Sequence, residues 1–327
     1  MISVVIPFKA RSSFDNKLLQ NLLNQILIQG KNMVSEIIII DSSQKDASVK
    51  PLAPFNSNIR FIHNPALKVG EARNVGVKVA KENIVLFLDA DCELPQGFFK
   101  NVERLMKDLS EDVIAIGGPV KSTPKSSIIQ KYFDYSIFSP FPRHEHGHII
   151  FWKNFHKHHH PNMCNLMIRR DVFLKTGGCW PEAGEDVYYQ LKVTRLGYKI
   201  KYSPKLLVFH NNPKSFIELT RKFIRLGTSA ANLFLEFPTS PLMLHRFIKS
   251  LIIILPLLVM IFIQPLVGTF MLFMPLLIFY FYRTKKFKHA IIYTFLDVSF
   301  QLVYLTAFTK SLLKELMMRG AKRCLRV

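Results

Sequence analysis

The sequence has few of the residues that would support a disulfide-stapled or zinc-bound fold. Its 327 residues include only four cysteines, which stand far apart at positions 92, 164, 179 and 324. They show neither paired nor metal-ligand spacing, which disfavours a disulfide framework or a zinc site and favours reduced thiols in a cytoplasmic domain. The opening run Ser3–Pro7 has no basic start, long apolar stretch or small-residue cleavage site behind it. We therefore expect no cleaved secretion signal.

Glycine and acidic residues are also scarce where particular functions would need them. Residues 3–16 contain no glycine, which counts against a nucleotidyltransferase or related enzyme with a glycine-rich phosphate loop there. Only 23 Asp and Glu oppose 44 Lys and Arg, and the formal net charge of +21 indicates an anionic partner. Anionic lipid, phosphorylated substrates and nucleic acid all qualify. Nucleic acid is disfavoured, because the basic residues gather around apolar segments instead of alternating with aromatic residues.

Charge is nearly absent from Phe247 to Tyr282, where Lys249 is the only charged side chain. One straight helix of this length would be about 50 Å long, whereas a bilayer core is about 30 Å thick. We therefore predict a transmembrane helical hairpin over 247–282, broken near Gln264-Pro265 and Gly268. A buried helix of a soluble domain is the alternative.

Basic residues on both sides of this hairpin predict its orientation. They are Arg221, Lys222, Arg225, His245, Arg246 and Lys249 before it, and Arg283, Lys285, Lys286 and Lys288 after it. By the positive-inside rule, residues 1–246 lie in the cytoplasm, with 226–246 as a juxtamembrane linker, at the inner or plasma membrane. Residues 283–327 comprise a basic loop, a third apolar helix over about 289–313 and a basic tail. Asp297 and Gln301 fall on one face of that helix, so we predict that it lies in the interface, with a membrane crossing as the alternative.

Short β-branched runs alternate with helical patterns in the first 120 residues. The predicted strands are Ser3–Pro7, Glu36–Asp41, Arg60–His63, Ile84–Asp89 and Val113–Gly117, and the predicted helices are Lys17–Gln29, Gly70–Ala80 and Phe98–Leu109. This alternation predicts an α/β fold with a mainly parallel twisted sheet of right-handed βαβ units. Further strands are expected at Lys199–Tyr202 and Leu206–Phe209. Such a sheet binds ligands at the carboxyl ends of its strands.

Acidic residues follow two of these strands directly. Asp41 ends one, and Asp89-Ala90-Asp91 ends another. An aspartate here is often only the N-cap of the next helix, and this reading of Asp41 stays open. Two carboxylates spaced Asp-x-Asp can instead converge on one hard cation and leave its other positions to diphosphate oxygens.

Three other polar positions allow two readings each. Arg73, near the start of a helix, suits an anionic or carbonyl-bearing ligand because the helix dipole and the guanidinium attract the same partner, but without further context a solvated arginine is the preferred reading. Asp186 opens a helix, where it either complements the dipole or acts as a general base. His210 follows a strand, where a lone histidine is more often structural than a ligand.

Seven histidines occupy the poorly periodic stretch 121–161. They are His144, His146, His148, His156, His158, His159 and His160. No acidic or cysteine partner stands at ligand spacing, so a mobile basic loop that closes over a substrate is favoured over a zinc cluster.

The order of these motifs resembles that of glycosyltransferase family 2, which has the GT-A fold. The resemblance covers about residues 1–225 and depends on the following motifs: Ser-Val-Val-Ile-Pro at 3–7, Asp41, Gly-x-Ala-Arg-Asn-x-Gly at 70–76, Asp89-x-Asp91, Asn165 with Arg169-Arg170, Gly184-Glu185-Asp186 and Gly197-Tyr198-Lys199-Ile200. It implies a GT-A nucleotide-sugar-binding domain followed by an α-helical membrane region.

Site roles follow from this resemblance. It implies a nucleotide-sugar pocket lined by Pro7, Asp41, Arg73, Asp89 and Asp91. It also implies that Asp91 holds Mg²⁺ or Mn²⁺ with His210 nearby, that Asp186 is the base, and that Asn165 and Glu185 lie on the acceptor side. The second aspartate common after Asp41 is missing, so the donor base stays open. No Gln-x-x-Arg-Trp follows Asp186, which counts against a processive synthase.

The predicted function is inverting, metal-dependent sugar transfer from a nucleotide-sugar to a hydroxyl acceptor. Because the membrane anchor would put this chemistry at a lipid surface, we expect a lipid-linked acceptor, in cell-envelope polysaccharide or glycolipid synthesis, and the positive charge suits both its diphosphate and anionic lipid. The alternatives are an inactive GT-A-like binding or scaffold protein and a nucleotidyltransferase.

Overall fold

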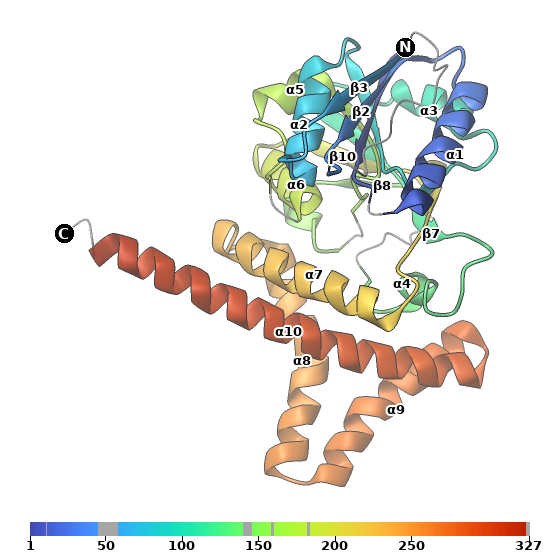
Figure 1. The fold of residues 1–327 in the computed structure, drawn as a ribbon. Coiled ribbons are helices and arrows are strands. Elements are labelled where there is room, and N and C mark those ends of the chain that lie inside the picture. The colour runs from blue at the N-terminus through green and yellow to red at the C-terminus, as the bar shows by residue number, and fades with distance from the viewer. Residues whose placement is uncertain (11, 45–57, 140–145, 158–159, 182–183, 325–327) are drawn as a thin grey trace. The chain divides into compact units, whose positions relative to one another are not determined.

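The computed structural model describes residues 1–10, 12–44, 58–139, 146–157, 160–181 and 184–324 (Figure 1). The chain packs as two compact units. The first comprises Met1–Pro124 and Phe141–Asn211, and the second comprises Lys125–Pro140 and Asn212–Val327. Residues 212–225, grouped with the catalytic domain from sequence, therefore pack within the second unit.

The first unit is built on an eight-stranded sheet. In spatial order its strands are β3 (Ile59–His63), β2 (Val34–Asp41), β1 (Ile2–Phe8), β4 (Ile84–Leu88), β9 (Asn165–Arg169), β6 (Val113–Gly117), β10 (Lys199–Tyr202) and β8 (His148–Ile150). Strands β3, β2, β1 and β4 run parallel, as do β6 and β10. Runs such as Ile37–Ile40 are wholly buried, as expected for strands covered on both faces. The predicted mainly parallel α/β architecture is confirmed.

Strand β9 was not predicted as a strand. It lies antiparallel between β4 and β6, with Leu88 opposite Asn165 and Ala115 opposite Ile168. Its five residues alone give no sign of this long-range pairing, because a short apolar run fits a buried strand or a helix equally well.

Helices pack against this sheet through apolar stripes. Their bounds in the first unit are α1 (Ser13–Gln29), α2 (Val69–Val79), α3 (Phe98–Met106), α5 (Arg170–Lys175) and α6 (Glu185–Arg195). Helix α1 buries Leu19, Leu22, Leu23 and Ile26, the spacing of one helical face. A small second sheet joins β5 (Cys92–Glu93), β11 (Val208–His210) and β7 (Val120–Ser122), with β11 in the middle.

Part of the histidine-rich stretch is ordered by the main sheet. Strand β8 pairs antiparallel with β10, and the ring of His148 stacks on Tyr202 with centroids 4.7 Å apart. A short 3₁₀ helix, η2, follows at Trp152–Asn154. The predicted mobile loop is thus wrong for residues 148–154, while His144, His158 and His159 lie outside the described residues.

The second unit is helical. It contains α4 (Tyr132–Tyr135), α7 (Phe216–Glu236), α8 (Pro241–Phe262), α9 (Pro265–Thr284) and α10 (Phe287–Cys324). Helices α8 and α9 form a hairpin whose break falls at Ile263-Gln264, as predicted (Figure 1). Gly268 lets the two helices approach, because a Cβ there would overlap the backbone of Met260.

Three helical stretches of this unit are long and apolar enough to cross a membrane. They are Pro241–Met260, Pro265–Thr284 and Phe287–Met318. Less than two fifths of each stretch is buried inside the protein, so most of their apolar surface lies outward. These helices fit the predicted membrane anchor.

The polar face of the third stretch points inward. Helices α7 and α10 lie side by side (Figure 1), and Asp297 and Gln301 of α10 are buried. The carboxylate of Asp297 accepts hydrogen bonds from the hydroxyls of Tyr132, Ser136 and Tyr280. Asp297 therefore ties α4 and α9 to α10.

Candidate active site

Asp41, the last residue of β2, orders one edge of the sheet. Its side chain is fully buried, and Oδ1 accepts hydrogen bonds from the Ser43 backbone N–H at 2.9 Å and the Ser43 hydroxyl at 2.5 Å. Nδ1 of His63 lies 3.2 Å from Oδ2. The Ser43 hydroxyl in turn accepts the backbone N–H of Ala10 at 2.7 Å. This turn links the carboxyl ends of β1, β2 and β3.

Arg73 joins two of the predicted site carboxylates. The residue is 2% exposed, and its guanidinium donates to Oδ1 of Asp89 at 2.8 Å and to Oε1 of Glu185. Burial alone would lower the pKa of this guanidinium, but Asp89 and Glu185 outweigh burial and raise it. Its Nε is buried with no hydrogen-bond partner among the described residues. An unsatisfied buried N–H is costly and is typical of a site completed by a ligand or water.

The residues around Arg73 explain the motif at 70–76. A Cβ on Gly70 would overlap the carbonyl of Trp180, so only glycine permits this approach. The amide of Asn74 donates to the Cys179 carbonyl at 2.9 Å and accepts the Cys179 N–H at 2.8 Å. A Cβ on Gly76 would overlap the side chain of Val5 in β1, so glycine also permits the close approach of α2 to the sheet. The motif therefore locks α2 to the sheet and to the chain that precedes α6.

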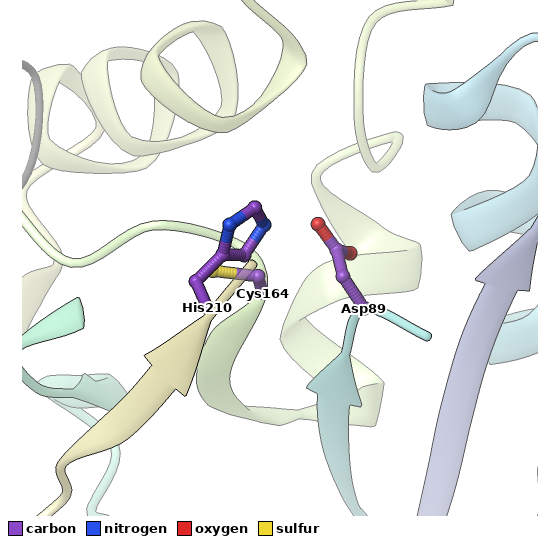
Figure 2. Close-up of side chains that lie close together, drawn as sticks. All are labelled: Asp89, Cys164 and His210. Carbon is purple, nitrogen blue, oxygen red and sulfur yellow. The ribbon is translucent and has the colours of Figure 1, made fainter. Parts of the chain in front are cut away.

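Asp89 and Asp91 face His210 across the end of β4. In the small sheet, His210 of β11 stands opposite Cys92 of β5, so it necessarily lies beside Asp91. Nε2 of His210 is 3.3 Å from Oδ1 of Asp91. Ligand atoms of Asp89, Cys164 and His210 all lie within 4.8 Å of one another (Figure 2). Among the residues that the structure describes, this is the one group of three or more such side chains that could hold a metal ion.

This donor set fits a divalent cation. Carboxylate oxygen and imidazole nitrogen are ordinary ligands of Mn²⁺, whereas Mg²⁺ prefers oxygen alone. From sequence we placed Asp91 and His210 at the cation. The structure groups Asp89 and the Cys164 sulfur with His210, whereas Asp91 is not a member of this group and instead lies 3.3 Å from Nε2 of His210 through its Oδ1.

Glu185 and Asp186 occupy the first turn of α6, after Gly184 in the left-handed conformation (φ 89°). Burial raises the pKa of Glu185 to about 7 against the opposing effect of Arg73, and Asp186 adds to the rise. Oδ1 of Asp186 accepts the Val187 backbone N–H at 2.7 Å. Adjacent carboxylates in different environments are the arrangement from which acid and base roles arise.

Asn165 and Pro7 belong to the sheet itself. Asn165 is fully buried, and its amide donates to the carbonyl of Leu206 and, at 3.4 Å, to that of Pro119. Its Oδ1 is buried without a partner in the described part of the chain. Pro7 lies in β1 opposite Ile40 of β2. The structure thus places Asn165 as a link between β9 and the chain around β11.

Sequence reasoning missed Cys164 and Asn74. Cys164 was read only as a reduced thiol, because the four cysteines stand far apart in the sequence. Its position just before Asn165 would have pointed to the site only if β9 had been predicted as the neighbour of β4. Asn74 was part of a recognised motif, but its contact with Cys179 spans 105 residues.

Comparison with known proteins gives one family. The model of glycosyl transferase family 2 matches residues 3–175, more than half of the chain. The chain is 21% identical over 235 residues to the uncharacterized glycosyltransferase EpsJ of Bacillus subtilis (strain 168), covering 68% of this chain and 64% of EpsJ. It is 24% identical over 234 residues to glycosyltransferase AglE of Haloferax volcanii, covering 69% of this chain and 71% of AglE. The chain thus spans less than two thirds of the length of EpsJ.

Solved structures share the fold. The mannosyltransferase PcManGT from Pyrobaculum calidifontis, in complex with GDP-Man and Mn²⁺, matches with a TM-score of 0.55 and 15% identity over 95% of this chain and 86% of that one. TarS 1-349 of S. aureus, in complex with UDP-GlcNAc, matches with a TM-score of 0.54 and 15% identity over 94% of this chain and 90% of that one.

Proposed function

The chain belongs to glycosyl transferase family 2, with a GT-A fold, and on this premise we propose that it transfers a sugar from a nucleotide-sugar to a hydroxyl acceptor. One observation carries the proposal. Arg73 bridges Asp89 and Glu185, His210 meets Asp91, and Asp186 follows Glu185 in the first turn of α6, so four carboxyl groups belong to the site beside the carboxyl ends of the strands. This is the edge at which open α/β sheets bind nucleotides.

The donor lies against the ends of β1, β2 and α2 in this proposal. Pro7, the Asp41 turn and Arg73 line its nucleotide, and Asp89 lies by the ribose and diphosphate. Support comes from the buried, unpartnered Nε of Arg73, which a phosphate or carbonyl oxygen of the donor would satisfy. Structural neighbours that hold GDP-Man and UDP-GlcNAc make both donors the first to test.

A divalent cation, Mn²⁺ or Mg²⁺, completes this donor site. Asp91 and Asp89 would hold it with His210. When bound, it supplies positive charge to the leaving diphosphate. The chain's own contribution is to fix these donors through the β4, β5 and β11 backbone, so that little reorganisation accompanies binding.

Asp186 is the base in a direct, inverting displacement. Its carboxylate takes the proton of the acceptor hydroxyl as the oxygen attacks the anomeric carbon and the bond to the diphosphate breaks. Glu185 lies on the acceptor side, where its contact with Arg73 fixes the start of α6. Asn165 acts from behind the site, since its amide is engaged with backbone carbonyls.

The helical unit anchors this chemistry at a membrane. The outward apolar surface of α8 and α9 supports a hairpin over 247–282. The helix over 289–313 lies in the interface in this proposal, because a crossing would leave the basic tail on the far side, and a crossing is the alternative that its length and composition allow. Basic flanks place the catalytic domain, about residues 1–225, on the cytoplasmic side. The acceptor is then lipid-linked, in cell-envelope polysaccharide or glycolipid synthesis.

The decisive experiment compares Asp186→Asn with Asp171→Asn. Asp171 is also a first-turn acid, on α5, and pairs with Arg169 at the surface, so it controls for charge loss at a helix start. The full chain in detergent is incubated with nucleotide-sugars, each with Mn²⁺ or Mg²⁺, and nucleoside diphosphate release is measured. We expect Asp186→Asn to lower turnover by about 10²- to 10⁴-fold, with donor affinity nearly unchanged. Equal turnover in the wild type, Asp186→Asn and Asp171→Asn would exclude Asp186 as the base. No turnover of any donor by the wild type would count against the proposed transferase activity itself.

A further inference from the structure

The candidate cation site contains a sulfur atom. The ligand atoms of Asp89, Cys164 and His210 lie within 4.8 Å of one another, and Figure 2 shows the Asp89 carboxylate pointing toward the His210 ring, with the Cys164 sulfur beside that ring. Cys164 is 4% exposed, while the side chains of Asp89 and His210 retain 29% and 14% exposure. The thiol therefore forms the inner wall of the group, and the carboxylate and imidazole form its outer part.

Backbone pairing imposes this position on Cys164. Strand β9 runs antiparallel to β4 with Leu88 opposite Asn165, so continuing the register by one residue sets Cys164 opposite Asp89. The position of His210 is fixed by the small sheet, in which it stands opposite Cys92. The Cys92 thiol donates toward the Cys164 carbonyl at 3.6 Å, and this contact joins the small sheet to the chain at Cys164. The convergence of the three donors thus follows from two strand registers.

A sulfur donor changes which cations such a site prefers. Mg²⁺ takes oxygen ligands and keeps much of its water, so a thiol gives it little. Zn²⁺, and likewise Co²⁺ and Cd²⁺, bind thiolate, imidazole and carboxylate together, often with three protein ligands and one open position. Asp89, Cys164 and His210 supply one ligand of each kind.

We propose that Cys164 is a metal ligand that makes this site bind thiophilic divalent cations. When such a cation enters, Asp89 Oδ, Cys164 Sγ and His210 N bind it, the thiol proton leaves to solvent, and waters leave the cation. Asp91, which lies 3.3 Å from His210, and an oxygen of water or of a bound diphosphate take the remaining positions. The site is that of the proposed function, but the binding needs no sugar transfer.

Cobalt absorption tests this assignment directly. Co²⁺ is titrated into the full chain in detergent, and the near-ultraviolet band of sulfur-to-cobalt charge transfer is recorded. Imidazoles of the histidine-rich stretch produce no such band, because only a bound thiolate gives it. We expect the band in the wild type, its loss in Cys164→Ser, and at least about tenfold weaker Co²⁺ binding in that variant. Mg²⁺ binding should change less than about twofold, since that cation gains little from sulfur.

Other cysteine variants serve as matched controls. Cys179→Ser removes a buried thiol of the same unit that lies outside the group, and Cys324→Ser removes the thiol of the C-terminal region. Both should keep the band. If the wild type lacks it, or if Cys92→Ser abolishes it while Cys164→Ser does not, the assignment is overturned. If Cys164→Ser folds poorly, a band that persists in each of Cys92→Ser, Cys179→Ser and Cys324→Ser assigns it to the one remaining thiol.

Nucleotide-sugar turnover with Mn²⁺, measured on the same preparation, separates this proposal from the proposed function. Turnover without the cobalt band refutes the sulfur ligand alone. The band without turnover supports the ligand and counts against the transferase.

Discussion

Replacing Arg73 by Met tests the electrostatic centre of the first unit. In the wild type, one guanidinium pairs with both Asp89 and Glu185, whose side chains are 29% and 12% exposed. Met fills a similar volume but leaves both carboxylates without that cation. Removing one partner of a buried ion pair costs about 3–5 kcal/mol, because the remaining charge stays in a poorly solvated position. With a urea dependence of about 2.5 kcal/mol per M, the unfolding midpoint should fall by about 1–2 M.

Tryptophan fluorescence reports this transition selectively. The chain has two tryptophans, Trp152 and Trp180, and both belong to the first unit. Urea titration of the full chain in detergent therefore follows that unit without a signal from the helical one. Arg169→Met is the control, because its pair with Asp171 is 28% and 60% exposed and should contribute less than about 1 kcal/mol.

The loss of stability in Arg73→Met should also depend on pH. Burial already raises the pKa of Glu185 to about 7 in the presence of Arg73, and losing the guanidinium raises it further. A carboxyl with a raised folded pKa favours the folded state when protonated. As pH falls from about 8 to 7, Glu185 of the variant therefore becomes protonated before that of the wild type, and the stability difference between the two proteins shrinks. Arg73→Lys keeps the charge but cannot bridge both partners, so its unfolding midpoint should lie between those of the wild type and Arg73→Met. A midpoint shift no larger than that of Arg169→Met, or one independent of pH, would refute this account.

Three further predictions concern other buried polar groups. Burial would raise the pKa of Glu36, but hydrogen bonds from Ser3 and the Lys81 N–H, together with Arg60, hold it below its usual range. Glu36→Gln should therefore lower the free energy of unfolding by about 2 kcal/mol at neutral pH, and urea midpoints should show this difference closing as pH falls below about 4. Asp297→Asn leaves three hydroxyls competing for one acceptor oxygen, which should lower the free energy of unfolding of the helical unit by about 2 kcal/mol. The thermal unfolding of the full chain, followed by helical circular dichroism, should then occur at a lower temperature. Asn74→Ala strands both backbone groups of Cys179, so amide exchange around that residue should accelerate, which exchange unchanged from the wild type would contradict.

Much of the fold follows from local sequence pattern. Continuous β-branched runs such as Ile37–Ile40 identify buried parallel strands within two residues of their ends, and α1 shows one apolar face. The hairpin break is equally local, because Pro265 cannot continue a hydrogen-bonded helix. Strands β8 and β9 were missed because their pairing depends on residues far away in the chain.

The site residues likewise divide into those that local motifs predict and those that only long-range pairing brings together. Asp89, Asp91 and His210 could be grouped from the order of motifs, and the structure brings His210 to 3.3 Å from Asp91. The Arg73–Glu185 bridge joins residues 112 positions apart, and no local pattern encodes it. Cys164 enters the site only through the register of β9 on β4.

The path of the chain between its two units constrains how it can be divided. The polypeptide enters the helical unit at Lys125, returns at Phe141 and enters it again at Asn212, so the two units are joined by three covalent crossings. A protein shortened after residue 211 would keep the excursion 125–140 and lose the partners of its aromatic rings. Tyr132 and Phe133, which pack on Phe223 of α7, would then face water and favour aggregation. A soluble version of the first unit therefore requires that this excursion be replaced by a short polar linker.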